Sequence, residues 1–175
     1  SMELEGRCVG LVGLGAIGQR FAATAHAMGM RIIGFDPFAT RVPTHIERVE
    51  LSDIWSQADV ISFHCPLSDG NRHLLNAEAL QQCKPGVLLI NTARGGLIDE
   101  AALLAAVQSG HVAQAGLDSF AIEPMTPEHP FQREANIILS PHIGGVTADA
   151  YTKMGIASAR NALRFISASH ATSHV

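Results

Sequence analysis

Short apolar runs alternate along the chain with segments in which apolar residues recur every three or four positions. The runs predict β-strands, of which the third is weak, at residues 8–14, 31–36, 47–50, 59–65, 87–91, 112–118 and 136–140. Most of these strands are apolar throughout instead of alternating, which is typical of parallel strands buried on both faces. Repeated strand–helix units of this kind predict an α/β domain with three layers.

The helical segments have identifiable ends. A helix with one apolar face is predicted at 17–28, a short helix at 52–55, and a long helix from about 147 past 160. Residues of the types that cap or end helices stand at the expected boundaries, namely Gly29, Ser52, Asn76, Asp99 and Gly110.

Composition narrows the picture to one globular domain. Apolar residues make up 47% of the 175 residues and charged residues 16%, which is typical of a chain with a well-buried core. The net charge of −4 comes without basic clusters, so we expect neither nucleic acid nor a membrane as a partner. Three scattered cysteines without a CxxC pair predict reduced thiols, a cytoplasmic protein and no metal site. We place the domain at 3–168 and a frayed tail at 169–175.

The first predicted strand runs directly into a glycine-rich turn. Gly13, Gly15 and Gly18 form a GxGxxG pattern that opens the first helix. The first glycine permits a tight turn, the second lets a pyrophosphate approach the backbone, and the third lets the helix pack closely against the strand. The backbone N–H groups at the start of the helix, around Ala16 and Ile17, favour the binding of phosphates. The sequence therefore predicts a Rossmann-type, doubly wound sheet that binds a dinucleotide.

Asp36 stands at the end of the second predicted strand, eighteen residues after Gly18. In the dinucleotide-binding fold an acid at this place accepts hydrogen bonds from the adenosine ribose. Its charge repels a 2′-phosphate, by roughly 4 kcal/mol for charges about 4 Å apart at an effective dielectric constant near 20. No arginine follows within four residues, so we predict NAD as the cofactor instead of NADP. The alternative is a tight turn without a ligand.

Polar residues that can take part in chemistry follow the other strands of the predicted sheet. Because parallel strands all end at one edge, where ligands bind, we expect these residues to converge on the cofactor. The polar residues are His64, Cys65, Thr92, Arg94, Asp118, Glu123 and His142, and their neighbours Pro66, Ala93 and Gly144 belong to the same strand ends. All of them except Glu123 are predicted to contact the cofactor.

Each of these polar residues has a structural alternative. Arg94 precedes two glycines, which suit the close approach of a small anion, but it can also be a surface residue. Glu123 can be a solvated loop residue, and His142 can be a structural histidine bonded to the backbone. His64 either lines the adenine side of the cofactor cleft or makes a hydrogen bond at the end of its strand.

Several stretches of the chain resemble the cofactor domain of the D-2-hydroxyacid dehydrogenases. They are "GLVGLGAIG" with "GFDP", "HCPLSDGNRHLLN", "LLINTARGGLIDEAALLAAVQSGHVAQAGLDSFAIEP" and "NIILSPHIGG". The resemblance covers residues 3 to about 165 and is nearest to the D-3-phosphoglycerate dehydrogenase and hydroxypyruvate reductase branches. It implies an oxidoreductase that transfers a hydride between NAD and a D-2-hydroxy or 2-keto acid.

The resemblance also implies roles for single residues. Arg94 corresponds to the arginine that binds the substrate carboxylate, and His142 to the histidine that donates and accepts the proton. Glu123 corresponds to the glutamate that favours the imidazolium, and Asp118 to the aspartate that holds the nicotinamide carboxamide. Formate dehydrogenases of this superfamily have glutamine in place of that glutamate, so their activity is not expected. Ser119 stands where valine is common in the family.

Members of this family have a second domain that closes over the cofactor and recognises the substrate. We expect that domain to be absent here, so that the chain alone is inactive and does not reveal which 2-hydroxy acid is used. The family also implies a homodimer formed through the present domain. Two alternatives stay open: a Rossmann-type methyltransferase, which does not need Arg94, Glu123 and His142, and an NAD(H)-sensing, corepressor-like scaffold, which can retain them.

Overall fold

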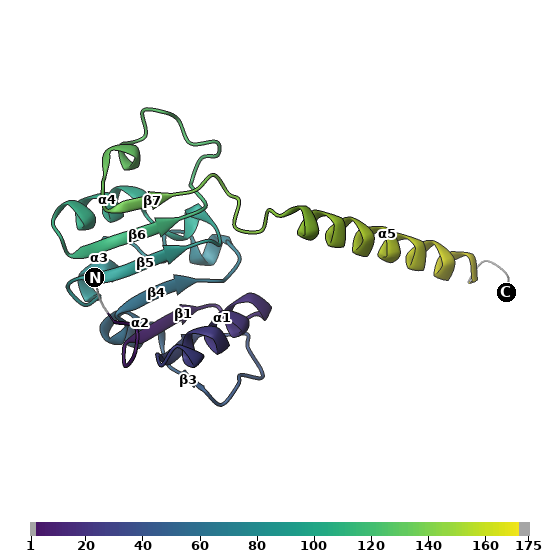
Figure 1. Ribbon diagram of the computed structural model, residues 1–175, viewed down its shortest axis with the longest axis horizontal. Helices are drawn as coiled ribbons and strands as arrows, with labels where there is room; N and C mark the ends of the chain where they lie inside the picture. The colour runs from purple at the N-terminus through teal and green to yellow at the C-terminus, as the bar shows by residue number, and fades with distance from the viewer. Residues whose placement is uncertain (1–2, 172–175) are drawn as a thin grey trace. The chain divides into compact units, whose positions relative to one another are not determined.

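A computed structural model describes the backbone of residues 3–171 and divides the chain into two compact units, 1–142 and 143–175. The first unit holds the sheet and the helices α1 to α4 (Figure 1). The second holds the helix α5 (Ala148–Ala171). The first three residues of the predicted tail are therefore helical, and 172–175 lie outside the described residues. No helix in the described part of the chain is long and apolar enough to cross a membrane.

The strands of the first unit form a single parallel sheet in the order β3-β2-β1-β4-β5-β6-β7 (Figure 1). Their bounds are β1 (Cys8–Val12), β2 (Arg31–Phe35), β3 (Ile46–Arg48), β4 (Val60–Phe63), β5 (Val87–Asn91), β6 (Val112–Leu117) and β7 (Ile137–Leu139). The chain moves outward from β1 in one direction and then returns to its other side at β4. This reversal between β1 and β4 is the switch point at which Rossmann-type sheets bind ligands. The predicted fold class is confirmed.

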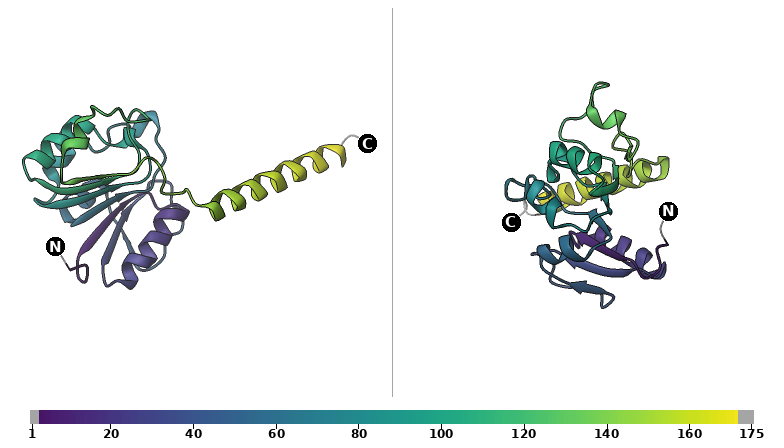
Figure 2. Two further views of the ribbon diagram at one scale, coloured as in Figure 1. Left: turned by 45° about the horizontal axis from the view of Figure 1, so that its top comes forward. Right: turned by 90° about the vertical axis from the view of Figure 1, so that its left-hand side faces the viewer.

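Helices cover the two faces of the sheet unequally (Figure 2). One face carries α2 (Leu51–Gln57), α3 (Ala77–Gln82) and α4 (Glu100–Gln108), and the other carries α1 (Ala16–Ala27). Three short 3₁₀ turns complete the unit, at Asp69–Asn71, Gly95–Leu97 and Pro130–Arg133.

The expectation of cover on both faces holds only for part of the sheet. Among the described residues of this unit, α1 packs over β1, β2 and β4, while the same face of β5 to β7 has no helix. That face is an open groove of about 360 Å³, lined among others by Leu88, Ile90 and Ile138, and Ile138 is 69% exposed.

The structure confirms two of the three predicted helix caps and corrects the third. The Asn76 carboxamide oxygen accepts the Ala79 N–H at 2.9 Å, and the Asp99 carboxylate accepts two N–H groups of the first turn of α4 at 3.1 Å. Helix α2 is capped by Glu50 and not by Ser52, because Glu50 and Asp53 bind each other's backbone N–H groups in a capping box. The cap therefore lies two residues earlier than predicted, and the helix is longer.

The three cysteines are free thiols within the first unit. Desolvation by burial raises the pKa of each, and raises the pKa of Cys83 to about 12. The thiols therefore stay protonated at neutral pH, which makes them poor nucleophiles and poor metal ligands.

Candidate active site

The turn between β1 and α1 is shaped by its glycines. Gly13 has φ +101°, in the left-handed region, and a Cβ there would lie 2.6 Å from the backbone nitrogen of Cys65. By contrast, no atom lies within 4 Å of a Cβ built on Gly15, so the turn is open on that side. Gly15 caps α1 without a side-chain hydrogen bond, and the first turn has no acidic residue. The N–H groups at this helix end lack intrahelical acceptors and can bind an anion.

Asp36 is held by backbone N–H groups on both of its carboxylate oxygens. Oδ2 accepts the N–H of Leu14 at 2.8 Å, and Oδ1 accepts those of Phe38 at 2.8 Å and Ala39 at 3.2 Å. The aspartate therefore fixes the glycine-rich turn relative to the end of β2. Sequence reasoning predicted its contact with a ribose but missed this positional role.

An arginine lies beside Asp36 although none follows it closely in the sequence. Nη2 of Arg48, on β3, donates to the backbone carbonyl of Asp36 at 3.3 Å. Both residues line a cavity of about 520 Å³ at the carboxyl ends of β2 and β3, together with Glu50 and Asp53. Three carboxylates face one guanidinium there, so the charge around the cavity disfavours an added phosphate.

The turn after β5 is organised by a buried amide that sequence reasoning missed. Asn91 is 1% exposed, and its side chain donates to the Arg94 carbonyl at 2.9 Å and accepts the Ala93 N–H at 3.0 Å. Arg94 itself is exposed, and its Nη1 donates to the Ala93 carbonyl at 2.6 Å. A polar residue that ends an apolar strand is the signal that could have identified Asn91. Thr92 is exposed beside this turn.

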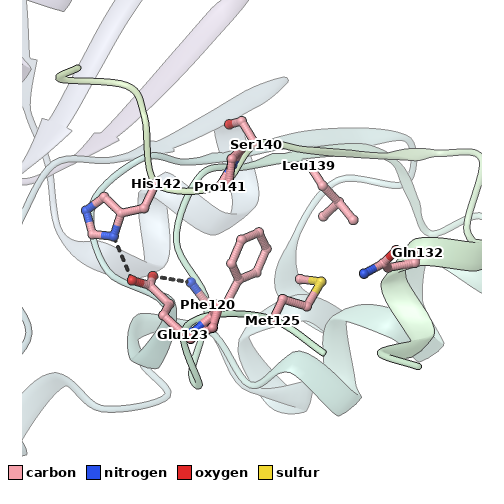
Figure 3. Close-up of a pocket in the computed structure, with 9 residues that line it drawn as sticks. Phe120, Glu123, Met125, Gln132, Leu139, Ser140, Pro141 and His142 are labelled. Carbon is pink, nitrogen blue, oxygen red and sulfur yellow. Dashed lines mark hydrogen bonds and ion pairs between the residues drawn. The ribbon is translucent and has the colours of Figure 1, made fainter. Parts of the chain in front are cut away.

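Glu123 and His142 form a direct pair (Figure 3). Nδ1 of His142 lies 2.7 Å from Oε2 of Glu123, while Oε1 of Glu123 accepts the N–H of Phe120 at 2.9 Å. The hydrogen bond with His142 and then the one from Phe120 lower the pKa of Glu123, and the positive charges of His142 and Arg94 act in the same direction. Glu123 is therefore a carboxylate at neutral pH, and its pairing through Nδ1 leaves Nε2 of His142 for proton exchange with a ligand.

The backbone at His142 adopts an unusual conformation. Its φ is +55°, in the left-handed region, and its N–H donates to the Ser140 carbonyl at 3.0 Å across Pro141. A residue other than glycine in this region costs on the order of 1–3 kcal/mol, and such residues cluster at functional sites. This conformation turns the chain at the end of β7, next to Glu123.

An apolar cavity of about 540 Å³ adjoins the Glu123–His142 pair (Figure 3). Phe120, Met125 and Leu139 are among the apolar residues that line it, and Gln132 adds a polar group. The pair itself is open to solvent, since the side chains of His142 and Glu123 are 47% and 36% exposed.

Asp118 is buried at the end of β6, with 4% of its surface exposed. It accepts the Ser140 hydroxyl at 2.6 Å, and its N–H donates to the Asn91 carbonyl at 2.9 Å. These bonds tie the ends of β5, β6 and β7 together. Ser119 is also buried, and its hydroxyl has no hydrogen-bond partner among the described residues.

His64 makes the hydrogen bond at the strand end that was one of its two interpretations. Its Nε2 lies 3.0 Å from the hydroxyl of buried Ser62, and its ring lies 5.3 Å from that of Phe21 on α1. Burial lowers the pKa of His64, so the ring is neutral at pH 7. Pro66 is exposed beyond it, and Gly144 belongs to the second unit.

At the switch point of this sheet, the start of α1 is open and has no side-chain cap, and an aspartate stands at the end of neighbouring β2. Rossmann-type domains bind dinucleotides at such a place. The same edge carries the Glu123–His142 pair. Fold and site together therefore define the protein class as a dinucleotide-binding domain with a carboxylate–imidazole pair at the edge of its sheet. The chain belongs to the family described as D-isomer specific 2-hydroxyacid dehydrogenase, NAD binding domain, whose model matches residues 1–144.

Relatives and solved structures agree with this family. A hydroxypyruvate reductase from Thermotoga maritima is 44% identical over 158 residues, which cover 88% of this chain and 51% of that protein. A D-3-phosphoglycerate dehydrogenase from Mycobacterium leprae is 44% identical over 156 residues, which cover 87% of this chain and 29% of that protein. The solved structure of a D-2-hydroxyisocaproate dehydrogenase superposes with a TM-score of 0.89 at 32% identity, covering 95% of this chain and 55% of that one.

Two consequences follow from these relatives. The chain spans about half the length of the reductase and less than a third of the phosphoglycerate dehydrogenase. The family excludes the methyltransferase alternative, and the names of these relatives give no support to a non-catalytic scaffold.

Proposed function

We propose that this chain is the cofactor domain of an NAD-dependent dehydrogenase that interconverts D-2-hydroxy acids and 2-keto acids, of the 3-phosphoglycerate or hydroxypyruvate type. The contact between Glu123 and His142, 2.7 Å long at the edge where the cofactor site lies, carries the proposal. A carboxylate paired with an imidazole supports proton transfer to and from a substrate oxygen. The family and the names of the relatives support the substrate class.

The residues present fit the cofactor. The open turn from Gly13 to Gly18 and the start of α1 suit the pyrophosphate, and the cavity between Asp36 and Arg48 suits the adenosine. The nicotinamide end is proposed to contact the residues that follow β5, β6 and β7, including Asp118. The contacts predicted for His64, Cys65, Pro66, Thr92, Ala93 and Gly144 complete the proposed site. Bound NAD supplies the hydride acceptor, and its reduced form the hydride donor.

The chain's own residues bind the substrate and move its proton. Arg94 holds the substrate carboxylate through its planar fork of N–H donors, a geometry that suits a bidentate contact. Nε2 of His142 gives a proton to the substrate oxygen when a keto acid is reduced, and takes it back when a hydroxy acid is oxidised. Glu123 stabilises the imidazolium through Nδ1 and keeps the ring oriented.

The test is a panel of 2-keto acids assayed with NADH on the protein joined to its substrate domain. Hydroxypyruvate, phosphohydroxypyruvate, glyoxylate and pyruvate distinguish the branches of the family. Oxidation of NADH with at least one of them is expected. Absence of turnover with all of them, together with NADH-dependent association of the protein, would favour the scaffold.

Substituting Asp36 is expected to change the choice of cofactor. Asp36→Ala removes a charged hydrogen-bond acceptor for the ribose, so NAD should bind about tenfold more weakly or worse. It also removes one of the three carboxylates that face Arg48 in this cavity, so the difference in affinity between NAD and NADP should become smaller. Calorimetric titration with both cofactors measures the two effects.

A double variant isolates the part played by the arginine. When Asp36→Ala is combined with Arg48→Ala, the affinity for NADP should be lower than in Asp36→Ala alone. The affinity for NAD should stay as low as in Asp36→Ala. The prediction about Asp36 is wrong if the unsubstituted domain already binds NADP as tightly as NAD.

Glu123→Gln is expected to move the pH profile of keto-acid reduction to lower pH. The lowered pKa of Glu123 means that its negative charge is present throughout the neutral range and is lost only under acidic conditions. Replacing that charge by a neutral amide makes the imidazolium less stable, so the alkaline limb of the profile should fall at a pH about 1–3 units lower. The measurement is kcat against pH for both proteins. A profile that does not move removes the glutamate from the proposed mechanism.

We also propose that the protein is cytoplasmic and forms a homodimer through this domain. The open apolar groove over β5 to β7 and exposed Ile138 offer surface for such an interface. Sedimentation velocity at tens of micromolar should show a dimer, and Ile138→Lys should shift it toward the monomer. A wild-type chain that sediments as a monomer contradicts the proposed pairing.

A further inference from the structure

Glu100, the first residue of α4, contacts the segment that leads from β6 to β7 and carries Glu123. Its Oε1 accepts the backbone N–H of Ala121 at 2.8 Å, and its Oε2 lies 3.5 Å from Nε2 of His129. The side chains of Glu100 and His129 are only 22% and 23% exposed. Both carboxylate oxygens are thus engaged by the same segment, at two separate places.

The backbone at Phe120 and Ala121 is also confined from another side. A Cβ placed on Gly95 would overlap the Phe120 carbonyl group and the Ala121 nitrogen. Gly95 directly follows Arg94, so the turn that carries the arginine packs against this backbone. Between Gly95 and Glu100, the peptide group that joins Phe120 to Ala121 has little room to move.

The orientation of Glu123 depends on this same stretch of backbone. The N–H of Phe120 donates to Oε1 of Glu123, whose other oxygen contacts His142. The N–H of the next residue, Ala121, is the one that Glu100 binds. Two adjacent amides therefore connect the start of α4 to the Glu123–His142 pair.

We propose that Glu100 is a positioning residue of the active site, which holds the Phe120–Ala121 backbone and thereby directs Glu123 toward His142. The proposal rests on the proposed function, because it assigns Glu100 a role in the same acid–base pair. Glu100 acts through the segment and does not touch the substrate. Without it, the Phe120 N–H loses its fixed place, and Glu123 turns away from the imidazole for part of the time.

The chain offers a matched control on the same helix. Near the other end of α4, the Gln108 side chain donates to Glu134 at 2.7 Å. Glu134 therefore ties the same helix to the far end of the same segment, close to β7. If Glu100 served only to attach the segment to α4, substitution of Glu100 and substitution of Glu134 would have the same effect on Glu123.

The experiment compares E100A, E100Q and E134A in this chain by NMR. Hydrogen exchange at Ala121 and Phe120 should accelerate about tenfold or more in E100A, because a hydrogen bond to a charged group is lost. The carboxyl-carbon titration of Glu123 should move up toward the ordinary pKa of a glutamate. E100Q keeps an acceptor oxygen for Ala121 and should restore most of both values, while E134A should leave both as in the wild type.

Several outcomes would overturn the proposal. These are a Glu123 titration in E100A that matches the wild type, or one in E134A that moves as far as in E100A. If E100A does not fold in a thermal melt, E100D takes its place, since it keeps the charge but withdraws it by one methylene. Unchanged exchange and titration in E100D would then overturn the proposal equally.

Activity of the protein with its substrate domain separates this proposal from the proposed function. E100A should lower kcat more than it raises KM and should move the pH profile in the direction expected for Glu123→Gln. The NMR readouts need no turnover, so a failure of the proposed enzymatic activity leaves them interpretable. A normal pH profile in E100A, in an enzyme whose profile does respond to Glu123→Gln, would count against Glu100.

Discussion

Replacing His142 with alanine is expected to lower kcat by about 10²–10⁴-fold in the protein joined to its substrate domain, the range that general acid–base catalysis contributes. The expectation follows from the pairing of Nδ1 with Glu123, which presents the other ring nitrogen for proton transfer. The alanine variant retains the glycine-rich turn and Asp36. Its affinity for NADH in calorimetry should therefore change little compared with its kcat.

Arg94→Lys is the matched comparison for the histidine variant. A lysine keeps the positive charge but cannot make the bidentate contact of a guanidinium, so KM should rise while kcat falls less than in His142→Ala. Steady-state kinetics with the best keto acid of the panel distinguishes the two patterns. A His142→Ala enzyme with a kcat within threefold of wild type would exclude proton transfer by this imidazole.

The second large effect concerns the chain alone, which is expected to bind NADH but not to turn over. Apart from Gly144, the residues proposed to hold the cofactor lie within the first unit, so binding should be measurable. Catalysis also requires a substrate held about 3–3.5 Å from its reaction partner, in a site that excludes water. Here Arg94 is exposed and the His142 side chain is 47% exposed. An ion pair in open solvent contributes only about 0–1 kcal/mol, too little to hold a small acid.

The measurement combines calorimetry with NADH and an NADH-oxidation assay of the chain with each keto acid. Binding without turnover supports the proposal that the substrate is recognised by residues outside this chain. Turnover near ordinary enzyme rates, about 1–10³ per second, would contradict it and would show that the 175 residues hold a complete active site. A chain that neither binds nor turns over would contradict the proposed cofactor site.

Local sequence signals predicted the parts of this fold that depend on near neighbours. The glycine-rich turn, the strand positions and the caps at Asn76 and Asp99 depend on residues that lie within a few positions of one another. Ser52 was predicted as a cap because serine commonly caps helices. The prediction was wrong because Glu50 and Asp53 supply the capping hydrogen bonds here as a pair.

Contacts between distant segments account for what the sequence did not reveal. Arg48 approaches Asp36 only because β3 pairs with β2, and the spacing of twelve residues carries no signal of it. The contact of Glu100 with Ala121 spans 21 positions and involves a backbone N–H. Every residue except proline has such a group, so the residue type at 121 does not indicate the contact. The meeting of Glu123 with His142 could be expected, since both follow strands that end at one edge of a parallel sheet. Its length and its use of Nδ1 could not.

The left-handed backbone at His142 also bears on how selection has acted on this position. On conformational grounds alone, glycine or asparagine suits that position better than histidine. A library selected only for thermal stability should therefore drift away from histidine at 142, while one selected for growth on a 2-hydroxy acid should retain it. The residue would then mark a place where selection for chemistry has overruled the preference of the polypeptide chain.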